Sequence, residues 1–224
     1  CHALVSKYKN NNLVKIGDAG VFSFYSNKNM TTGEGGMIVS RNQKFINNMR
    51  SLRNHGISKS LIERNKSLLT YNILQPGLNY RIDDLRASLG ISQITKLKKN
   101  NLKRKKLAER YKSLIKKNDI NIKIPFKEKI GLNYSYHLFP IILPREIDRS
   151  YFIKFFKERG IQLSFHYFPI HKFKIFKKYG KNLSMINQHV KKLLVLPTHH
   201  LLSKKYVISL SKSIILFYEK KKNI

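Results

Sequence analysis

The order of strand-like and helix-like segments along the chain predicts an α/β fold. Two short apolar segments, 19–25 and 36–40, have the composition of strands, and an amphipathic helix is expected at 42–54. Strand-like and helix-like segments alternate again in the second half of the chain, which is typical of α/β proteins. Hydrophobic residues make up 42% of the 224 residues, so the chain can build a packed core.

Each element is expected from its local pattern. A polar loop is predicted at 55–80, and the two aspartates before residue 85 are expected to open a helix that runs to about residue 98. Asn100 and Asn101 are expected to interrupt it, so that a second, lysine-rich helix reaches about residue 117. Further along, strands are expected at 134–143 and 161–168, helices at 147–159, 172–179, 184–193 and 203–219, and a loop at 196–200.

The chain is strongly basic. Its 45 lysines and arginines against 12 aspartates and glutamates give a net charge of +33, which raises the alternative of a nucleic-acid-binding protein. The lysines are scattered along the helices and do not form one tract with base-reading aromatics. We therefore expect the positive field to favour anionic substrates, with nucleic acid the less favoured partner.

Other features of the composition bear on location. No apolar run is long enough to span a bilayer, and no charged-then-apolar leader is present, so no membrane association is expected. A single cysteine, Cys1, excludes an internal disulfide framework and fits a reducing cytoplasm. Because the chain opens on Cys1, in what reads as a strand, we expect it to be a fragment of a longer protein.

The segment 17–36 carries the strongest chemical signal. It places Lys28 just after an apolar strand, with Ser23 five positions before it and the glycine-rich turn 33–36 after it. An amine at a strand end, beside a hydroxyl that can bind a phosphate, suits a lysine that forms a Schiff base with pyridoxal phosphate. Composition alone would place a lysine of so basic a chain in solvent, so the context of Lys28 carries the prediction.

These residues resemble the sugar aminotransferase family called DegT/DnrJ/EryC1/StrS, in which a similar segment surrounds the cofactor lysine. Further segments resemble the family in the same order along the chain. They are 1–4, 52–56, 77–81, 84–90, 136–140, 165–171 and 196–199. The resemblance implies a PLP-dependent transferase fold of type I, similar to aspartate aminotransferase and incomplete here. Residues 1–98 would be the C-terminal part of the large cofactor-binding domain, and 99–224 a connecting helix with the small C-terminal α/β domain.

The resemblance also implies roles for individual residues. Lys28 would hold pyridoxal 5′-phosphate and act as the catalytic acid and base, with a pKa lowered by a desolvated, cationic pocket. Ser23 and Asn79 would bind the cofactor phosphate, Asn79 in the partner subunit's site, and His2 would contact the cofactor ring. The aspartate that pairs with the pyridinium nitrogen is expected just before Cys1, outside this chain.

Three further residues, His166, Arg81 and His55, are candidates for substrate binding. Each also has a structural interpretation: Arg81 could pair with Asp83 or Asp84, and His55 could cap its loop. His166 and His171 do not have the spacing of a metal site, and no cluster of carboxylates or cysteines accompanies them, so no metal is expected.

The function implied is amino transfer from an amino acid, expected to be L-glutamate, to a nucleotide-linked keto-sugar. Such an enzyme would serve amino-sugar synthesis for lipopolysaccharide or other surface glycans, as a cytoplasmic homodimer with shared active sites. The sugar, the carbon and the nucleotide stay open. The alternatives are a basic nucleic-acid-binding protein and a truncated, catalytically inactive fragment.

Overall fold

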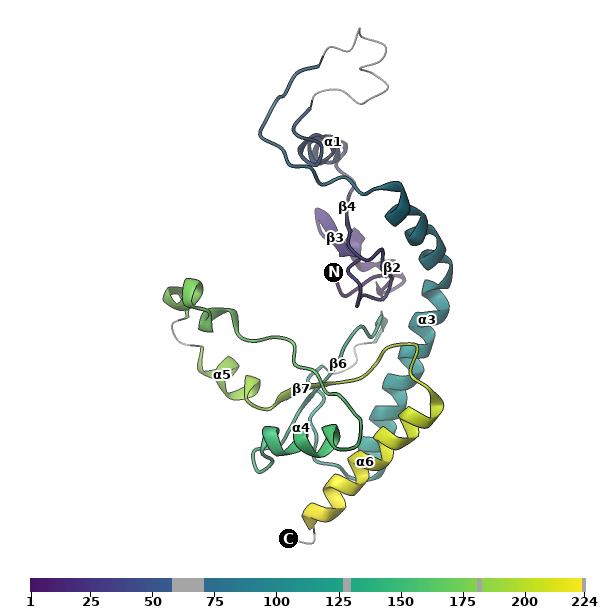
Figure 1. Ribbon diagram of the computed structural model, residues 1–224, viewed down its shortest axis with the longest axis vertical. Coiled ribbons are helices and arrows are strands. Elements are labelled where there is room, and N and C mark those ends of the chain that lie inside the picture. The colour runs from purple at the N-terminus through teal and green to yellow at the C-terminus, as the bar shows by residue number, and fades with distance from the viewer. Residues whose placement is uncertain (58–70, 127–129, 181–182, 223–224) are drawn as a thin grey trace. The chain divides into compact units, whose positions relative to one another are not determined.

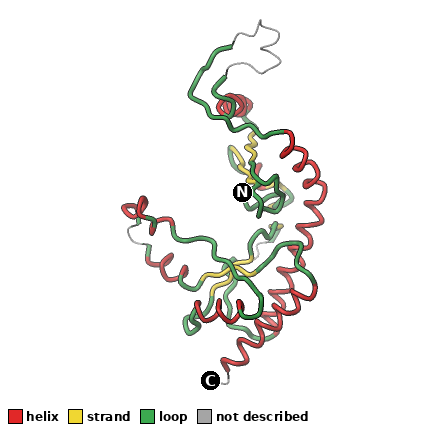
Figure 2. Tube along the Cα trace, in the orientation of Figure 1, coloured by secondary structure: helices red, strands yellow, loops and turns green. Residues whose placement is uncertain are grey.

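The computed structural model describes residues 1–57, 71–126, 130–180 and 183–222 (Figure 1). They form two compact units: Cys1–Lys98 with Gly131–Ser135, and Lys99–Ile130 with Tyr136–Ile224. The strands are short, and helices and loops make up most of both units (Figure 2). None of the helices in the described ranges has the length and apolar character needed to cross a membrane. Most of the loop predicted at 55–80 lies outside the described residues.

The first unit contains two small antiparallel sheets. Strands β3 (Ala19–Ser23) and β4 (Gly36–Ser40) pair with Ser23 opposite Gly36, which confirms the strands expected at 19–25 and 36–40. The second sheet has the order β2-β1-β5. Its strands are β1 (Lys7–Tyr8), β2 (Asn11–Asn12) and β5 (Leu132–Asn133), and the short helix η1 (Leu13–Lys15) follows β2.

Two helices begin at side-chain caps that the sequence supplies. Helix α1 (Gln43–Leu52) begins after Asn42, whose Oδ1 accepts a hydrogen bond from the Phe45 amide at 3.0 Å. At the start of α3 (Asp84–Lys117), Asp83 Oδ1 accepts from the Arg86 amide at 2.8 Å, and this bond lowers the pKa of the Asp83 carboxyl. The helices expected from residues 42 and 84 are therefore confirmed.

The break expected at Asn100 and Asn101 was wrong, because α3 is continuous from Asp84 to Lys117. Asparagine inside a helix costs less than about 1 kcal/mol relative to alanine. Asn100 is buried, and the following turns pack Leu107, Ala108 and Tyr111 into the core of the second unit. The packing of these apolar residues outweighs a small local penalty, so the helix continues.

The second unit places a two-stranded antiparallel sheet beside helices. Strand β6 (Phe139–Ile142) pairs with β7 (Leu193–Leu196), so that Ile141 lies opposite Leu194. The helices are α4 (Arg149–Lys157), α5 (Ser184–Val190) and α6 (Lys204–Lys222), with the 3-10 turns η2 (Ile170–Lys172) and η3 (Lys174–Tyr179). Asp148 caps α4 by accepting from the Tyr151 amide at 2.7 Å.

Several expected strands were wrong. The strand expected at 134–143 forms only at β6, because Tyr136, with φ 45°, turns the chain before it. Residues 161–168 form only an isolated bridge between Ser164 and Val195. Strand β7 lies where the predicted helix 184–193 ends and the predicted loop 196–200 begins. The local pattern did not show this strand, because its partner β6 is far away in sequence. Residues 1–3 have no regular structure, although a strand was expected there.

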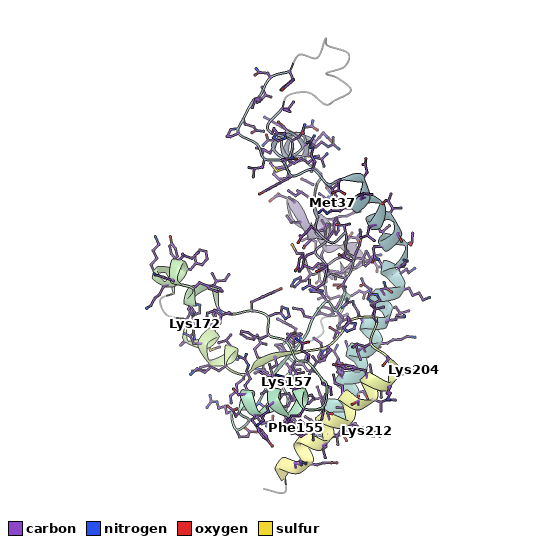
Figure 3. All side chains as sticks on the ribbon, in the orientation of Figure 1. Met37, Phe155, Lys157, Lys172, Lys204 and Lys212 are labelled. Carbon is purple, nitrogen blue, oxygen red and sulfur yellow. The ribbon has the colours of Figure 1, made fainter. Side chains whose placement is uncertain are left out.

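The core of the second unit is largely aromatic. Phe152 and Phe156 are fully buried on α4 and stack at 4.6 Å between ring centroids, and Phe217 of α6 meets Phe152 edge-on at 4.7 Å. Phe155, labelled on α4 in Figure 3, also packs on Phe217, with the centroids 5.1 Å apart. Aromatic packing thus joins α4 to α6, while lysines such as Lys212 stay exposed.

Replacing Phe156 with alanine should lower the free energy of unfolding of this unit by about 3–5 kcal/mol, because a fully buried ring leaves a cavity. Urea unfolding followed by tyrosine fluorescence measures the change. Ile130, 99% exposed, provides the control, since Ile130→Ala should change the free energy of unfolding by less than about 0.5 kcal/mol. An equal loss in both variants would contradict the packing described for α4.

Candidate functional site

Lys28 lies in a turn that is tied to the end of strand β3. The Phe24 amide donates to Gly35 O at 2.8 Å, the Lys28 amide to Tyr25 O at 3.0 Å, and the Thr32 amide to Phe24 O at 2.9 Å. Phe24 is buried with Met30 and Leu97 in the small core of the first unit. The backbone on both sides of Lys28 is therefore fixed, so its half-buried side chain begins from a defined position.

The Lys28 amine contacts His2. Lys28 Nζ lies 2.8 Å from His2 Nε2, which is hydrogen-bond distance, and both side chains are half-buried. A lysine ammonium donates and a neutral imidazole nitrogen accepts, so this geometry suits a hydrogen bond from Lys28 Nζ to His2 Nε2. The structure thus brings together two predicted site residues that are far apart in sequence.

Three buried residues that the sequence analysis missed surround this pair. Ser135 Oγ donates to His2 O at 2.6 Å, and the Ser135 amide donates to Ser6 Oγ at 3.0 Å. Asn29 Nδ2, from the residue after Lys28, donates to Ser135 O at 2.8 Å. The position of Asn29 directly after Lys28 could have marked it as a site residue. Ser6 and Ser135 carry no local signal, because their contacts depend on the pairing of β5 with β1.

Ser23 ends strand β3, where its Oγ accepts a hydrogen bond from the Tyr25 amide at 3.4 Å. The glycine turn that follows Lys28 needs its glycines. Gly35 has φ 151°, and a Cβ there would meet Thr32 Oγ1 at 2.5 Å. A Cβ at Gly36 would meet Phe22 O at 2.9 Å. The turn therefore holds Ser23 and Lys28 at one end of the β3–β4 hairpin.

The predicted residues His55, Asn79 and Arg81 form a second, exposed group. The Leu78 amide donates to Leu52 O at 2.8 Å, and the His55 amide donates to Leu78 O at 3.1 Å. Arg81 Nε donates to Asn79 Oδ1 at 3.2 Å. Two paired backbone segments thus present an imidazole, an amide and a guanidinium together. Asp83, one of the carboxylates considered for Arg81, forms an ion pair with Arg86.

His166 belongs to the second unit. Its half-buried ring places Nδ1 3.4 Å from Ser164 Oγ and meets the Tyr167 ring edge-on at 4.8 Å. His171 Nε2 lies 3.1 Å from Asn187 Oδ1, a contact that gives this histidine a structural partner. Within the described ranges, no group of three or more histidine, cysteine, aspartate or glutamate side chains could hold a metal ion.

Arg104 is a buried cation in the second unit that the sequence did not distinguish from its neighbours. Only 4% of it is exposed, and its Nη1 donates to Thr198 O at 3.2 Å. Burial lowers the pKa of Arg104 to about 10, and burial together with the Arg104 charge lowers the pKa of His199. Since Tyr111 OH also donates to Pro197 O at 2.7 Å, α3 fixes the loop that follows β7.

Known proteins resemble this chain over most of its length. Residues 1–214 match the sequence model of the DegT/DnrJ/EryC1/StrS aminotransferase family. Among curated proteins, the chain is 34% identical over 179 residues to a UDP-4-amino-4,6-dideoxy-N-acetyl-β-L-altrosamine transaminase of Campylobacter jejuni, a match that covers 79% of this chain and 46% of the relative. The chain spans about half the length of the curated relatives it matches.

Solved structures show the same likeness. Helicobacter pylori PseC, an aminotransferase involved in the biosynthesis of pseudoaminic acid, superposes with a TM-score of 0.87 at 26% identity, covering 98% of this chain and 58% of PseC. The PLP form of the putative sugar aminotransferase Spr1654 from Streptococcus pneumoniae superposes with a TM-score of 0.85 at 25% identity, covering 98% and 56%.

The exposed group around Asn79 depends on close contact between two backbone segments at Gly77, where a Cβ would meet Gly56 N at 2.2 Å and Leu52 O at 2.7 Å. Gly77→Ala should therefore separate the segments and speed hydrogen exchange at the Leu78 amide by about tenfold or more, since that amide loses its acceptor. Exchange measured by mass spectrometry tests this. Gly17→Ala, whose new Cβ would have Ala19 O at 3.8 Å as its nearest neighbour, should leave this amide unchanged. Equal protection in Gly77→Ala would contradict the contact.

Proposed function

The chain belongs to the DegT/DnrJ/EryC1/StrS aminotransferase family, with the type I fold of its solved relatives, and we propose that the complete protein transfers an amino group from an amino acid to a nucleotide-linked keto-sugar. The family's cofactor is pyridoxal 5′-phosphate. The observation that supports the proposal most is the half-buried Lys28 amine, held at the end of β3 and 2.8 Å from His2 Nε2.

The described residues fit this cofactor. Lys28 Nζ is a primary amine in a fixed turn, and a primary amine is the group that reacts with the cofactor aldehyde. The polar imidazole of His2 lies beside it. Ser23 Oγ is a candidate ligand for the cofactor phosphate, and we propose Asn79 as a second one, acting in the partner subunit. When bound, the cofactor supplies an electron sink for the carbon that carries the amino group.

Lys28 is the proposed catalytic residue. Its Nζ would hold the cofactor and, once released by the incoming amine, would move a proton from the substrate carbon to the cofactor, as amino transfer requires. Both roles require an amine that is held in a defined position and is partly shielded from water. The fixed backbone at Phe24 and Lys28 supplies the placement, and partial burial supplies the shielding. His2 Nε2 holds Nζ at hydrogen-bond distance and limits the directions it can take.

The substrate class is proposed from charge and from the relatives. A net charge of +33 favours an anionic substrate, and a nucleotide sugar carries its charge on phosphates. The Campylobacter relative is titled a UDP-sugar transaminase. We propose Arg81, His55 and His166 as substrate-binding residues and L-glutamate as the amino donor. The exposed guanidinium of Arg81 can bind a phosphate or carboxylate with two hydrogen bonds.

We also propose where this chemistry takes place. Residues 1–98 would be the C-terminal part of a large cofactor-binding domain, and residues 99–224 the connecting helix and small domain. The active enzyme would be a cytoplasmic homodimer with shared sites, serving surface-glycan synthesis. The exposed position of Asn79 supports a role across an interface, and the single cysteine fits a reducing compartment.

In the complete protein, Lys28→Ala should abolish the visible absorbance of bound pyridoxal phosphate and lower turnover with glutamate by at least about a thousandfold, because the covalent holder and the proton carrier are one group. Absorbance and a coupled assay for 2-oxoglutarate measure the two effects. Lys44→Ala, an exposed lysine on α1, is the matched control and should retain both. Multiple turnovers by Lys28→Ala would rule out this assignment.

Mixing two inactive variants of the complete protein, Lys28→Ala and Asn79→Asp, tests the shared site. The added carboxylate of Asn79→Asp should repel the cofactor phosphate. If Asn79 acts in the partner's site, each mixed dimer has one site with both defects and one with neither. After complete exchange of equal amounts, half of the dimers are mixed, so about a quarter of wild-type activity should return. If it acts in its own subunit's site, none returns. Mass spectrometry confirms that mixed dimers have formed.

A further inference from the structure

The position of His2 beside Lys28 is not explained by local structure. Residues 1–3 have no regular secondary structure, so neither a helix nor a sheet holds the His2 backbone. Lys28 Nζ nevertheless lies 2.8 Å from His2 Nε2. A contact this short between two long side chains requires that the backbone of each is fixed, because free rotation would otherwise favour other positions.

Ser135 supplies what the His2 segment lacks. Its Oγ donates to His2 O at 2.6 Å, and its amide donates to Ser6 Oγ at 3.0 Å. The Ser6 amide in turn donates to Ala3 O at 2.9 Å, which closes a turn directly after His2. One serine therefore holds the segment at two points, His2 and Ser6.

The same serine is also bonded to the Lys28 turn. Ser135 O accepts a hydrogen bond from Asn29 Nδ2 at 2.8 Å, and Asn29 is the residue next to Lys28. The carbonyl, amide and hydroxyl of Ser135 thus bond to Asn29, Ser6 and His2. Ser135 is the shared connection between the two backbones that carry the Lys28 and His2 side chains.

Burial makes these bonds effective restraints. Ser6, Asn29 and Ser135 are 5%, 5% and 4% exposed. Water cannot easily replace a hydrogen bond at such sites, and leaving a buried polar group unpaired is costly. The position of Ser135 is set by strand β5, which ends two residues before it and whose Asn133 pairs with Lys7 of β1. The restraint therefore belongs to the fold of the first unit.

We propose that Ser135 is a positioning residue that sets the contact between His2 and Lys28 and so prepares the Lys28 amine for the cofactor aldehyde. The inference rests on the proposed function for its consequence, although the restraint on His2 stands without the cofactor. In this role Ser135 contacts neither the Lys28 amine nor the substrate. It acts through the backbone of His2.

The first experiment measures attachment of pyridoxal phosphate to Lys28 in the complete, cofactor-free protein. The amine nitrogen bonds to the aldehyde carbon with loss of water, borohydride then reduces the new C=N bond, and the labelled peptide is quantified by mass spectrometry over time. Ser135→Ala should slow attachment about three- to tenfold, the factor that corresponds to one buried hydrogen bond. Ser213→Ala removes another buried hydroxyl, bonded to Ser209 O at 2.9 Å in α6, and should not change the rate.

A double-mutant cycle separates positioning from a general loss of stability. In a His2→Ala background the imidazole is gone, so Ser135→Ala should have no further effect on the attachment rate. Equal slowing by Ser135→Ala in both backgrounds would show that the serine acts independently of His2 and would overturn the proposal. An unchanged rate in the single variant would overturn it as well.

A readout that needs no cofactor distinguishes this inference from the proposed function. The measurement is NMR of the protein with isotope-labelled histidines, in which the His2 ring signals are assigned by their loss in His2→Ala. These signals should move in Ser135→Ala toward those of an unrestrained histidine. They should stay in place in Ser213→Ala. If the wild type never attaches pyridoxal phosphate at Lys28, the proposed function fails, while a shift of the His2 signals still supports the restraint. Unmoved His2 signals in Ser135→Ala would refute it.

Discussion

The return of the chain to the first unit at Gly131–Ser135 is the constraint on which the Lys28 region depends. The segment comes back after α3 and pairs through β5 with β1, with Leu132 opposite Tyr8 and the Lys9 amide donating to Gly131 O at 2.8 Å. Without this pairing, Ser135 would have no reason to lie next to His2, since 133 positions separate the two in sequence. The candidate site is therefore built from three segments, of which only the Lys28 turn is local.

The β3–β4 hairpin contributes a different kind of order, because its geometry is fixed by short-range requirements. The register places Ser23 opposite Gly36, and the turn between the strands uses glycines at Gly33 and Gly35 with positive φ. Side chains at these positions would be strained or would clash with the turn itself. The hairpin joins residues close in sequence, whereas the position of His2 depends on residues 131–135, which are distant in sequence.

Charge has a separate role from packing. Lysine and arginine outnumber aspartate and glutamate by 45 to 12, so most cations cannot each have a carboxylate of their own. Among the described residues, most of these cations are exposed, as Lys157, Lys204 and Lys212 are (Figure 3). Arg104 is the contrasting case: it is buried, it donates to the carbonyl of Thr198, and burial lowers its pKa to about 10. The exposed charge attracts anions, while the buried one fixes a loop.

Local patterns in the sequence were enough to predict the family, the α/β class and the residues on which the proposal centres. The spacing of Ser23, Lys28 and the glycine turn lies within one hairpin, and the caps at Asn42, Asp83 and Asp148 act within their own first turns. Three features could not be predicted from local patterns: α3 continues through Asn100, residues 193–196 form a strand, and Ser135 bonds to both His2 and Asn29. Each of these depends on a partner distant in sequence: helix packing outweighs a small local penalty, a strand needs a neighbour to pair with, and a buried serine bonds to whatever the fold places beside it.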